Sequence, residues 1–156
     1  MLMKLAPKKP RSLRNFYLSI GATLVLMLAG RFYALKAEEQ RVAQRAQWVE
    51  NVLHLNSTLP RQVDALTRLE RIDIISGDTI AYRYQVDMAS SSLPWERKSK
   101  MEARVRAGLE RLACKEPEFL EAMRRFKFRQ EHFYTGYDNA FLFSVDINPD
   151  KLNCPT

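Results

Sequence analysis

The sequence predicts an α+β protein in which N-terminal helices precede a four-stranded, mainly antiparallel sheet packed against helices on one face. Three observations predict this class. The hydrophobic period changes from 3.6 to 2 twice along the chain, so that helical segments precede each of two pairs of strands. No low-complexity linker divides residues 57–156. The length of 156 residues, 46% of them hydrophobic, suits one domain of ordinary size.

Positive charge is concentrated near the N-terminus. The chain has 25 Lys and Arg against 18 Asp and Glu, a net charge of +7. Residues 1–36 hold seven basic residues and no acidic one, which leaves 18 of each sign in residues 37–156. Because residues 37–156 are formally neutral, the net charge of +7 does not indicate nucleic-acid binding. The cluster of basic residues in 1–36 is instead typical of a membrane-orientation signal.

A long apolar run follows the first basic residues. Residues 16–30 carry no charge, and residues 32–35 extend the run beyond Arg31 to about 20 positions, enough to cross a hydrocarbon core of about 30 Å. The positive-inside rule then predicts a cytoplasmic basic tail over 1–15, a transmembrane helix over 16–35 and a periplasmic remainder of a bacterial inner-membrane protein. A cleaved signal peptide is the alternative, disfavoured because both candidate cleavage sites place Leu where a small residue is required.

Two helices are predicted after the apolar run. Residues 36–56 contain neither Gly nor Pro and many helix-forming residues, so we expect a stalk helix that docks its last turns on the domain. Pairing of this helix with another membrane protein is the alternative. Pro60 suits a first helical turn, and Val63 and Leu66 recur at three-residue spacing, which predicts a short helix ending near Leu69. The periplasmic α+β domain is expected to begin at residue 57.

Two antiparallel hairpins are predicted from patterns of period 2. The first joins strands over 72–74 and 80–86 through a tight turn that contains Gly77. The second joins a strand that begins at Phe126 to a strand over 141–147. The two hairpins supply the four strands of the predicted sheet.

A long amphipathic helix is predicted between the hairpins. It begins near Pro94, and its apolar stripe consists of Met101, Val105, Leu109 and Leu112. A second short helix is expected over residues 117–123, with two carboxylates in or beside its first turn.

The chain has two cysteines, Cys114 and Cys154, which are 40 positions apart. Export would place both outside the cytoplasm, so we expect a structural disulfide that joins the end of the long helix to the C-terminal tail. A catalytic thiol pair would need a spacing such as C-x-x-C, which the sequence lacks.

The sequence carries no recognisable motif for catalysis, metal binding or cofactor binding. His54 and His132 are the only histidines, and neither lies at a metal-ligand spacing from another His, Cys or carboxylate. A G-x-S-x-G elbow and the Gly-rich phosphate loops are absent. We therefore expect a protein that is not an enzyme and uses neither metal nor cofactor.

One basic cluster is a candidate binding surface. In a strand, Arg125, Lys127 and Arg129 would share one face, while Phe126 and Phe128 would point to the other. Exposed aromatic residues would be needed for RNA binding, and export excludes contact with nucleic acid. The cluster is therefore either a solvated face or a docking patch for an acidic partner or anionic lipid head groups.

Three features together resemble a group of small exported bacterial proteins. They are the segment LPRQVDALTRL over 59–69, which matches the pattern LPxxVDxxTRL, the strand TIAYRY over 79–84, which matches TxxYxY, and the pair Cys114 and Cys154. The resemblance implies a bacterial envelope protein with a disulfide-bonded α+β domain and no settled activity. In size, element order and disulfide the chain is also similar to secretion pilotins, but it lacks their lipid-attachment cysteine.

Non-catalytic binding is the function that these features predict. The leading hypothesis is a single-pass inner-membrane protein whose periplasmic domain binds partner proteins as an accessory or assembly subunit of a bacterial envelope complex. The alternative is a periplasmic ligand sensor or an inhibitor of the immunity type. Its surface site would then consist of Tyr82, Tyr84 and Tyr137.

Overall fold

The computed structural model describes residues 13–154, with side chains described from Thr23 onward. The chain divides into two compact units, residues 1–46 and 47–156. Helix α1 (Leu13–His54) forms the described part of the first unit and contributes its last two turns to the second. The predicted tail over 1–15 lies almost entirely outside the described residues.

The prediction of a membrane span over 16–35 is wrong. Within the described part of the chain, no helix is both long enough and apolar enough to cross a membrane. Arg31 and Lys36 interrupt the apolar run, and Glu38 and Glu39 follow directly. The predicted location, an inner-membrane protein with a cytoplasmic N-terminus and a periplasmic domain, depended on that span and is overturned with it.

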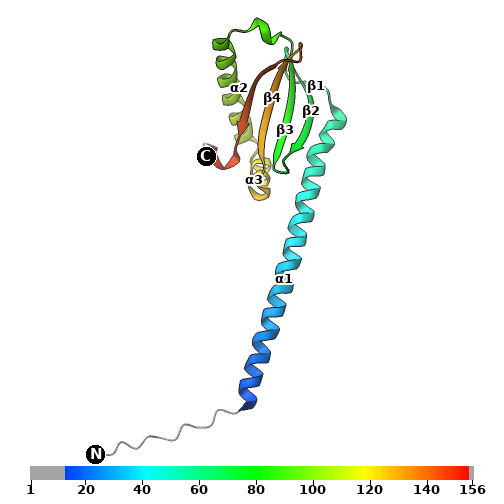
Figure 1. Cartoon of the computed structure of the whole chain (residues 1–156), viewed down its shortest axis with the longest axis vertical. Helices are drawn as coiled ribbons and strands as arrows, with labels where there is room; N and C mark the ends of the chain where they lie inside the picture. The colour runs from blue at the N-terminus through cyan, green and yellow to red at the C-terminus, as the bar shows by residue number, and fades with distance from the viewer. Residues whose placement is uncertain (1–12, 155–156) are drawn as a thin grey trace, which may run out of the picture. The chain divides into compact units, whose positions relative to one another are not determined.

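The second unit contains a mixed sheet of five strands in the order β1-β2-β3-β4-β5 (Figure 1). Neighbouring strands are antiparallel except β3 and β4, which are parallel. The predicted sheet of four mainly antiparallel strands is therefore wrong in strand number and in its central pairing. The strands are β1 (Arg61–Gln62), β2 (Thr67–Ile75), β3 (Thr79–Val86), β4 (Arg129–Gly136) and β5 (Phe141–Ile147).

The parallel pairing follows from the connection between β3 and β4. This connection contains helices α2 (Trp95–Lys115) and α3 (Pro117–Phe126), preceded by the short helix η2 (Ser90–Ser92). The chain leaves the sheet at the end of β3, and the helical crossover carries it back to the end of the sheet at which β3 began, so β4 runs in the same direction as β3. The predicted long helix is confirmed as α2.

The short helix predicted to end near Leu69 is replaced by extended structure. Helix α1 ends in the short helix η1 (Leu55–Thr58), and β1 then pairs with the first residues of β2. The turn between them is closed by amide groups of Val63 and Asp64, which donate to the carbonyl oxygen of Thr67 at 2.9 and 3.3 Å. The Asp64 carboxylate accepts from the amide of Leu66. These bonds favour a hairpin over a helix.

The strand predicted to begin at Phe126 begins three residues later. Helix α3 continues through Phe126, and Lys127 ends it in the left-handed conformation, with φ 57° and ψ 48°. The amide of Phe128 then donates to the carbonyl of Met123 at 2.8 Å, a helix-ending bond. Because of this turn, residues 125–128 do not alternate as a strand would.

Helices cover one face of the sheet, and the hydrophobic core lies between these helices and that face. Under α2, the buried residues Tyr84, Val86, Phe143 and Val145 pack against Met101, Val105 and Leu109. Under α3 and the last turns of α1, Ile72 and Ile80 pack with Val52, Met123 and Phe128. Trp48 of α1 contacts the rings of Phe119, Phe126 and Phe128.

The opposite face of the sheet carries a lattice of ion pairs. Asp73 accepts hydrogen bonds from Nε of Arg71 at 3.0 Å and from Nε of Arg83 at 2.8 Å. The Arg83 guanidinium also lies over the ring of Phe133, 5.4 Å from its centroid. We call this surface, made by Arg71, Asp73, Arg83, Glu131 and Phe133, the open sheet face.

Candidate functional site

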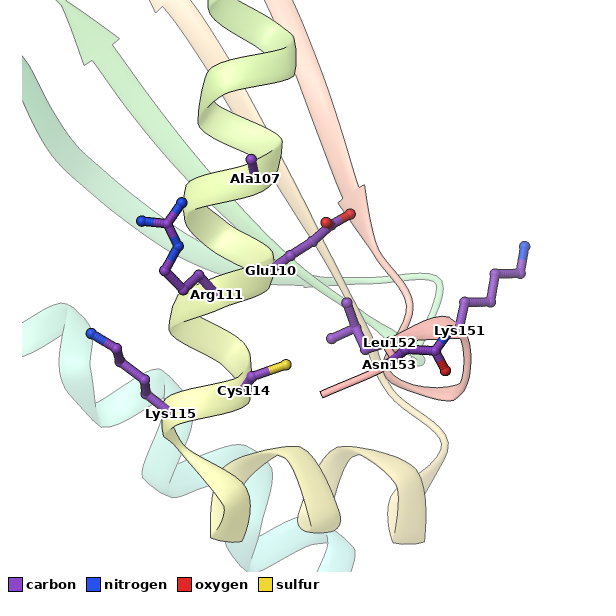
Figure 2. Close-up of a pocket in the computed structure, with 8 residues that line it drawn as sticks. All are labelled: Ala107, Glu110, Arg111, Cys114, Lys115, Lys151, Leu152 and Asn153. Atoms are coloured by element: carbon purple, nitrogen blue, oxygen red, sulfur yellow. The ribbon is translucent and has the colours of Figure 1, made fainter. Parts of the chain in front are cut away.

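A groove of about 600 Å³ lies between the C-terminal half of α2 and the segment that follows β5 (Figure 2). This volume falls in the range of about 300–1,000 Å³ that is usual for binding sites. We call it the basic groove. Its lining residues are Ala107, Glu110, Arg111, Cys114 and Lys115 from α2, and Lys151, Leu152 and Asn153 from the C-terminal segment.

The two walls of the basic groove are joined covalently. Cys114 and Cys154 form a disulfide with a Cα–Cα distance of 5.4 Å, which confirms the predicted bond. A second link involves the same segment, at Pro149. The Arg124 guanidinium donates to the carbonyl oxygen of Pro149 through Nε at 3.0 Å and Nη2 at 2.9 Å. These two links hold the segment after β5 against α2 and α3.

The floor of the groove is apolar and its rims are basic. Ala107, Leu152 and the disulfide sulfur of Cys114 supply apolar surface. Figure 2 shows Arg111 and Lys115 extending from one rim on α2, while Lys151 extends from the other wall. The lining therefore holds three cations and one carboxylate, that of Glu110.

The cations of the groove and the cations of the open sheet face differ in whether they are paired with a carboxylate. Arg111, Lys115 and Lys151 make no ion pair or side-chain hydrogen bond with any residue in 23–154. On the open sheet face, by contrast, Arg71 and Arg83 both bind Asp73. A second hollow of about 360 Å³ there is lined by Arg68, which pairs with Glu70 and donates to Gln85. Positive charge therefore stays uncompensated in the groove and is compensated on the sheet.

The three residues of the predicted basic patch do not share a strand face. Arg125 lies in the last turn of α3, with its guanidinium 5.5 Å from the ring centroid of Phe126. Lys127 is the left-handed residue that ends α3, and Arg129 opens β4 and donates from Nε to Thr79 Oγ1 at 2.9 Å. All three are exposed, and their binding to an acidic partner or lipid stays a prediction.

The three tyrosines of the alternative site are not brought together. Tyr82 and Tyr84 point to the helix-covered face, where Tyr82 stacks on His132 and Tyr84 stacks on Tyr134 at centroid distances of 4.7 Å. Tyr137 is exposed in the turn after β4 and lines a smaller hollow of about 240 Å³ near the β1–β2 turn.

The buried tyrosines and histidine form a neutral core network. Burial raises the pKa of Tyr82 and of Tyr134 to about 12 and raises the pKa of Tyr84 further, so these hydroxyls stay protonated. Burial lowers the pKa of His132 to about 4. Its Nε2 lies 3.3 Å from Gln130 Oε1, which suits a proton on Nε2 and a structural role.

The described residues hold no group of three or more His, Cys, Asp or Glu side chains arranged to bind a metal ion. The groups that line the groove are three cations, one carboxylate, the Asn153 amide and apolar surface. This combination can bind a ligand by charge and burial, and it contains no nucleophile paired with a base.

Of the residues that line the groove, only Cys114 was a candidate from the sequence, as one half of the predicted disulfide. The groove residues come from the last turns of α2 and from the tail, segments that the predicted disulfide already brought together. The repeated cations of these two segments, Arg111 and Lys115 in one and Lys151 in the other, were the signal that could have identified it.

Comparison with known proteins identifies the fold. The sequence matches no family model, and no curated protein is significantly similar to it. A secreted protein of Pseudomonas aeruginosa is structurally similar with a TM-score of 0.55 and 14% sequence identity, covering 72% of this chain and 96% of that one. The pilotin EpsS of the Vibrio vulnificus type 2 secretion system gives a TM-score of 0.54 and 8% identity, covering 75% of this chain and 98% of that one. At these identities the similarity shows the fold alone.

Proposed function

We propose that this chain is an exported, non-catalytic accessory protein that binds a partner of a bacterial envelope complex through the basic groove. The observation that carries the proposal is the groove itself, a hollow of about 600 Å³ with unpaired cations on its rims and no catalytic pair among its lining residues. Its lining is suited to binding and not to catalysis.

Two further observations support the compartment and the class of function. The Cys114–Cys154 disulfide favours an oxidising compartment, because disulfides persist outside the cytoplasm. The fold is shared with a secreted protein and with a pilotin of a type 2 secretion system, which favours an accessory role in the envelope. The fold similarity is an analogy, since one fold hosts many functions.

The sensor or inhibitor alternative is less well supported by the geometry. It requires Tyr82 and Tyr84 to be accessible beside Tyr137, whereas Tyr82 is partly buried and only 8% of Tyr84 is exposed. A ligand could reach the Tyr84 ring only by displacing the side chains that pack over it.

Site-specific photo-crosslinking in cells of the source organism tests the proposal. A benzophenone amino acid replaces Ala107, which is exposed in the groove, and the matched control replaces Gln62, which is exposed in β1. We expect a single envelope protein, identified by mass spectrometry, to crosslink from position 107 and not from position 62. The proposal fails if position 107 gives no product or gives the same products as position 62.

A further inference from the structure

We propose that the occupant of the basic groove is an acidic segment of the partner protein that also carries an apolar anchor side chain. This inference rests on the proposed function and adds the chemistry of the partner. It follows from three features of the groove: its unpaired charge, its apolar floor and its concave shape.

Charge complementarity selects an acidic occupant. The lining has three basic residues and one acidic residue, which leaves an excess of two positive charges. Arg111 and Lys115 are one turn apart on α2, and Lys151 belongs to the C-terminal segment. Figure 2 shows all three side chains directed away from the space between the two walls, so their charges lie at the outer edges of the groove, where carboxylates of a segment laid across it would meet them. These cations have no described partner to give up, so binding requires no existing ion pair to break.

The floor of the groove adds a requirement for an apolar side chain. Ala107, Leu152 and the sulfur of Cys114 offer no hydrogen-bonding group to a carboxylate or a phosphate. An apolar side chain seated there would be removed from water, and burial of apolar surface contributes about 25 cal/mol per Å².

The shape and the single carboxylate favour a polypeptide over a lipid surface. A planar membrane presents phosphates to convex or flat basic surfaces, whereas these cations border a hollow. Glu110 lies among the lining residues, where its carboxylate could accept hydrogen bonds from the backbone amides of an inserted segment.

Fluorescence anisotropy with the full chain and two labelled peptides tests the inference. One peptide of about twelve residues contains glutamate and leucine in a mixed order, and the other replaces each glutamate by glutamine. We expect the glutamate peptide to bind about tenfold or more tightly than the glutamine peptide, with an affinity that falls as salt rises from about 50 to 500 mM.

Two charge-reversal variants with the same change in net charge test whether the glutamate peptide binds in the groove. The groove variant combines Arg111→Glu, Lys115→Glu and Lys151→Glu. The control variant combines Arg97→Glu, Lys100→Glu and Arg104→Glu, three exposed cations in the first half of the same helix. Both change the net charge equally, and we expect about tenfold weaker binding of the glutamate peptide in the groove variant only. Circular dichroism verifies that each variant is folded.

The outcomes separate the two proposals. Equal binding of the two peptides, or equal loss in both variants, overturns the acidic segment. Displacement of the glutamate peptide by vesicles of phosphatidylglycerol, at concentrations at which phosphatidylcholine vesicles do not act, assigns the groove to lipid and also overturns it. If crosslinking from position 107 identifies a partner while the peptides show no charge dependence, the proposed function stands and the acidic occupant does not.

Discussion

The hydroxyl oxygen of Tyr84 lies 3.2 Å from Nδ1 of His132 inside the core, on the helix-covered face of two parallel neighbouring strands. The other ring nitrogen of His132 lies 3.3 Å from Gln130 Oε1. A neutral imidazole protonated on Nε2 satisfies both contacts, since Nδ1 accepts from the tyrosine and Nε2 donates to the amide oxygen. Protonation of Nδ1 would remove that acceptor from a buried site.

The first prediction concerns pH. Burial lowers the pKa of His132 to about 4 in the folded protein, against an ordinary value of 6.5 in the unfolded chain. As the pH falls, the unfolded state binds a proton at this imidazole before the folded state does. The stability that the neutral imidazole contributes to the folded state is therefore intact above pH 6.5 and is lost as pH falls toward 4. The loss amounts to about 3 kcal/mol of unfolding free energy. Urea denaturation at a series of pH values measures it.

Two histidine variants test the source of that pH dependence. His132→Gln should remove most of the loss between pH 6.5 and pH 4, whatever its effect on stability at neutral pH. His54→Gln, at an exposed position near the end of α1, should keep the loss unchanged. The assignment to His132 is wrong if the two variants show the same pH profile as the wild-type chain.

The second prediction concerns the disulfide. Cys114 and Cys154 close a loop with a sequence separation of 40. In the chain-entropy model a crosslink of this length stabilises by about 4 kcal/mol, so the double variant Cys114→Ser and Cys154→Ser should lose about that amount. The midpoint of urea unfolding measures it. Dithiothreitol should lower the midpoint of the wild-type chain and leave that of the double variant unchanged.

The third prediction concerns two glycines. A Cβ atom on Gly136 would lie 2.6 Å from the carbonyl oxygen of Met88 and would also contact Asp138, so Gly136→Ala should destabilise the protein by about 2 kcal/mol. Gly108 has open space around its Cβ position in the exposed middle of α2. Gly108→Ala should therefore stabilise by up to about 1 kcal/mol. Thermal unfolding of the two variants should shift in opposite directions.

The fourth prediction concerns Trp48, which attaches the end of α1 to the domain. Its ring centroid lies 5.1 Å from that of Phe128, 5.6 Å from that of Phe119 and 5.8 Å from that of Phe126. Trp48→Ala should cost about 3 kcal/mol of unfolding free energy. Val42→Ala, at an exposed position of the same helix, should change it by less than about 0.5 kcal/mol. Similar costs for both would contradict the packing role of the tryptophan.

Some elements could be predicted because their signals are local. Met101, Val105 and Leu109 recur with the period of a helix, whereas the apolar residues from Ile80 to Val86 alternate with the period of a strand. The Cys114–Cys154 pair was predictable because a two-cysteine chain in an oxidising compartment has one intramolecular disulfide available to it. These signals determined the α+β class, α2, the first hairpin and the covalent link between helix and tail.

Other features depend on contacts between segments that are distant in the chain. Tyr82 and Tyr84 alternate with polar residues and could face either side, and only packing against α2 and the ring of His132 places them in the core. The basic groove likewise exists because the tail folds back on α2 after β5. Hydrophobic periodicity describes one segment at a time and carries no information on which surfaces meet.

The types of most elements were therefore predictable from the sequence, because helix period and strand period are properties of short segments, and the disulfide was predictable from the cysteine count. Tertiary structure alone decided the parallel pairing of β3 with β4, the strand β1 in place of a helix, and the end of α3 at Lys127. Strand pairing and burial are set by free-energy differences between whole arrangements of the chain, and these differences outweigh the local preferences of residues such as Val63 and Phe126.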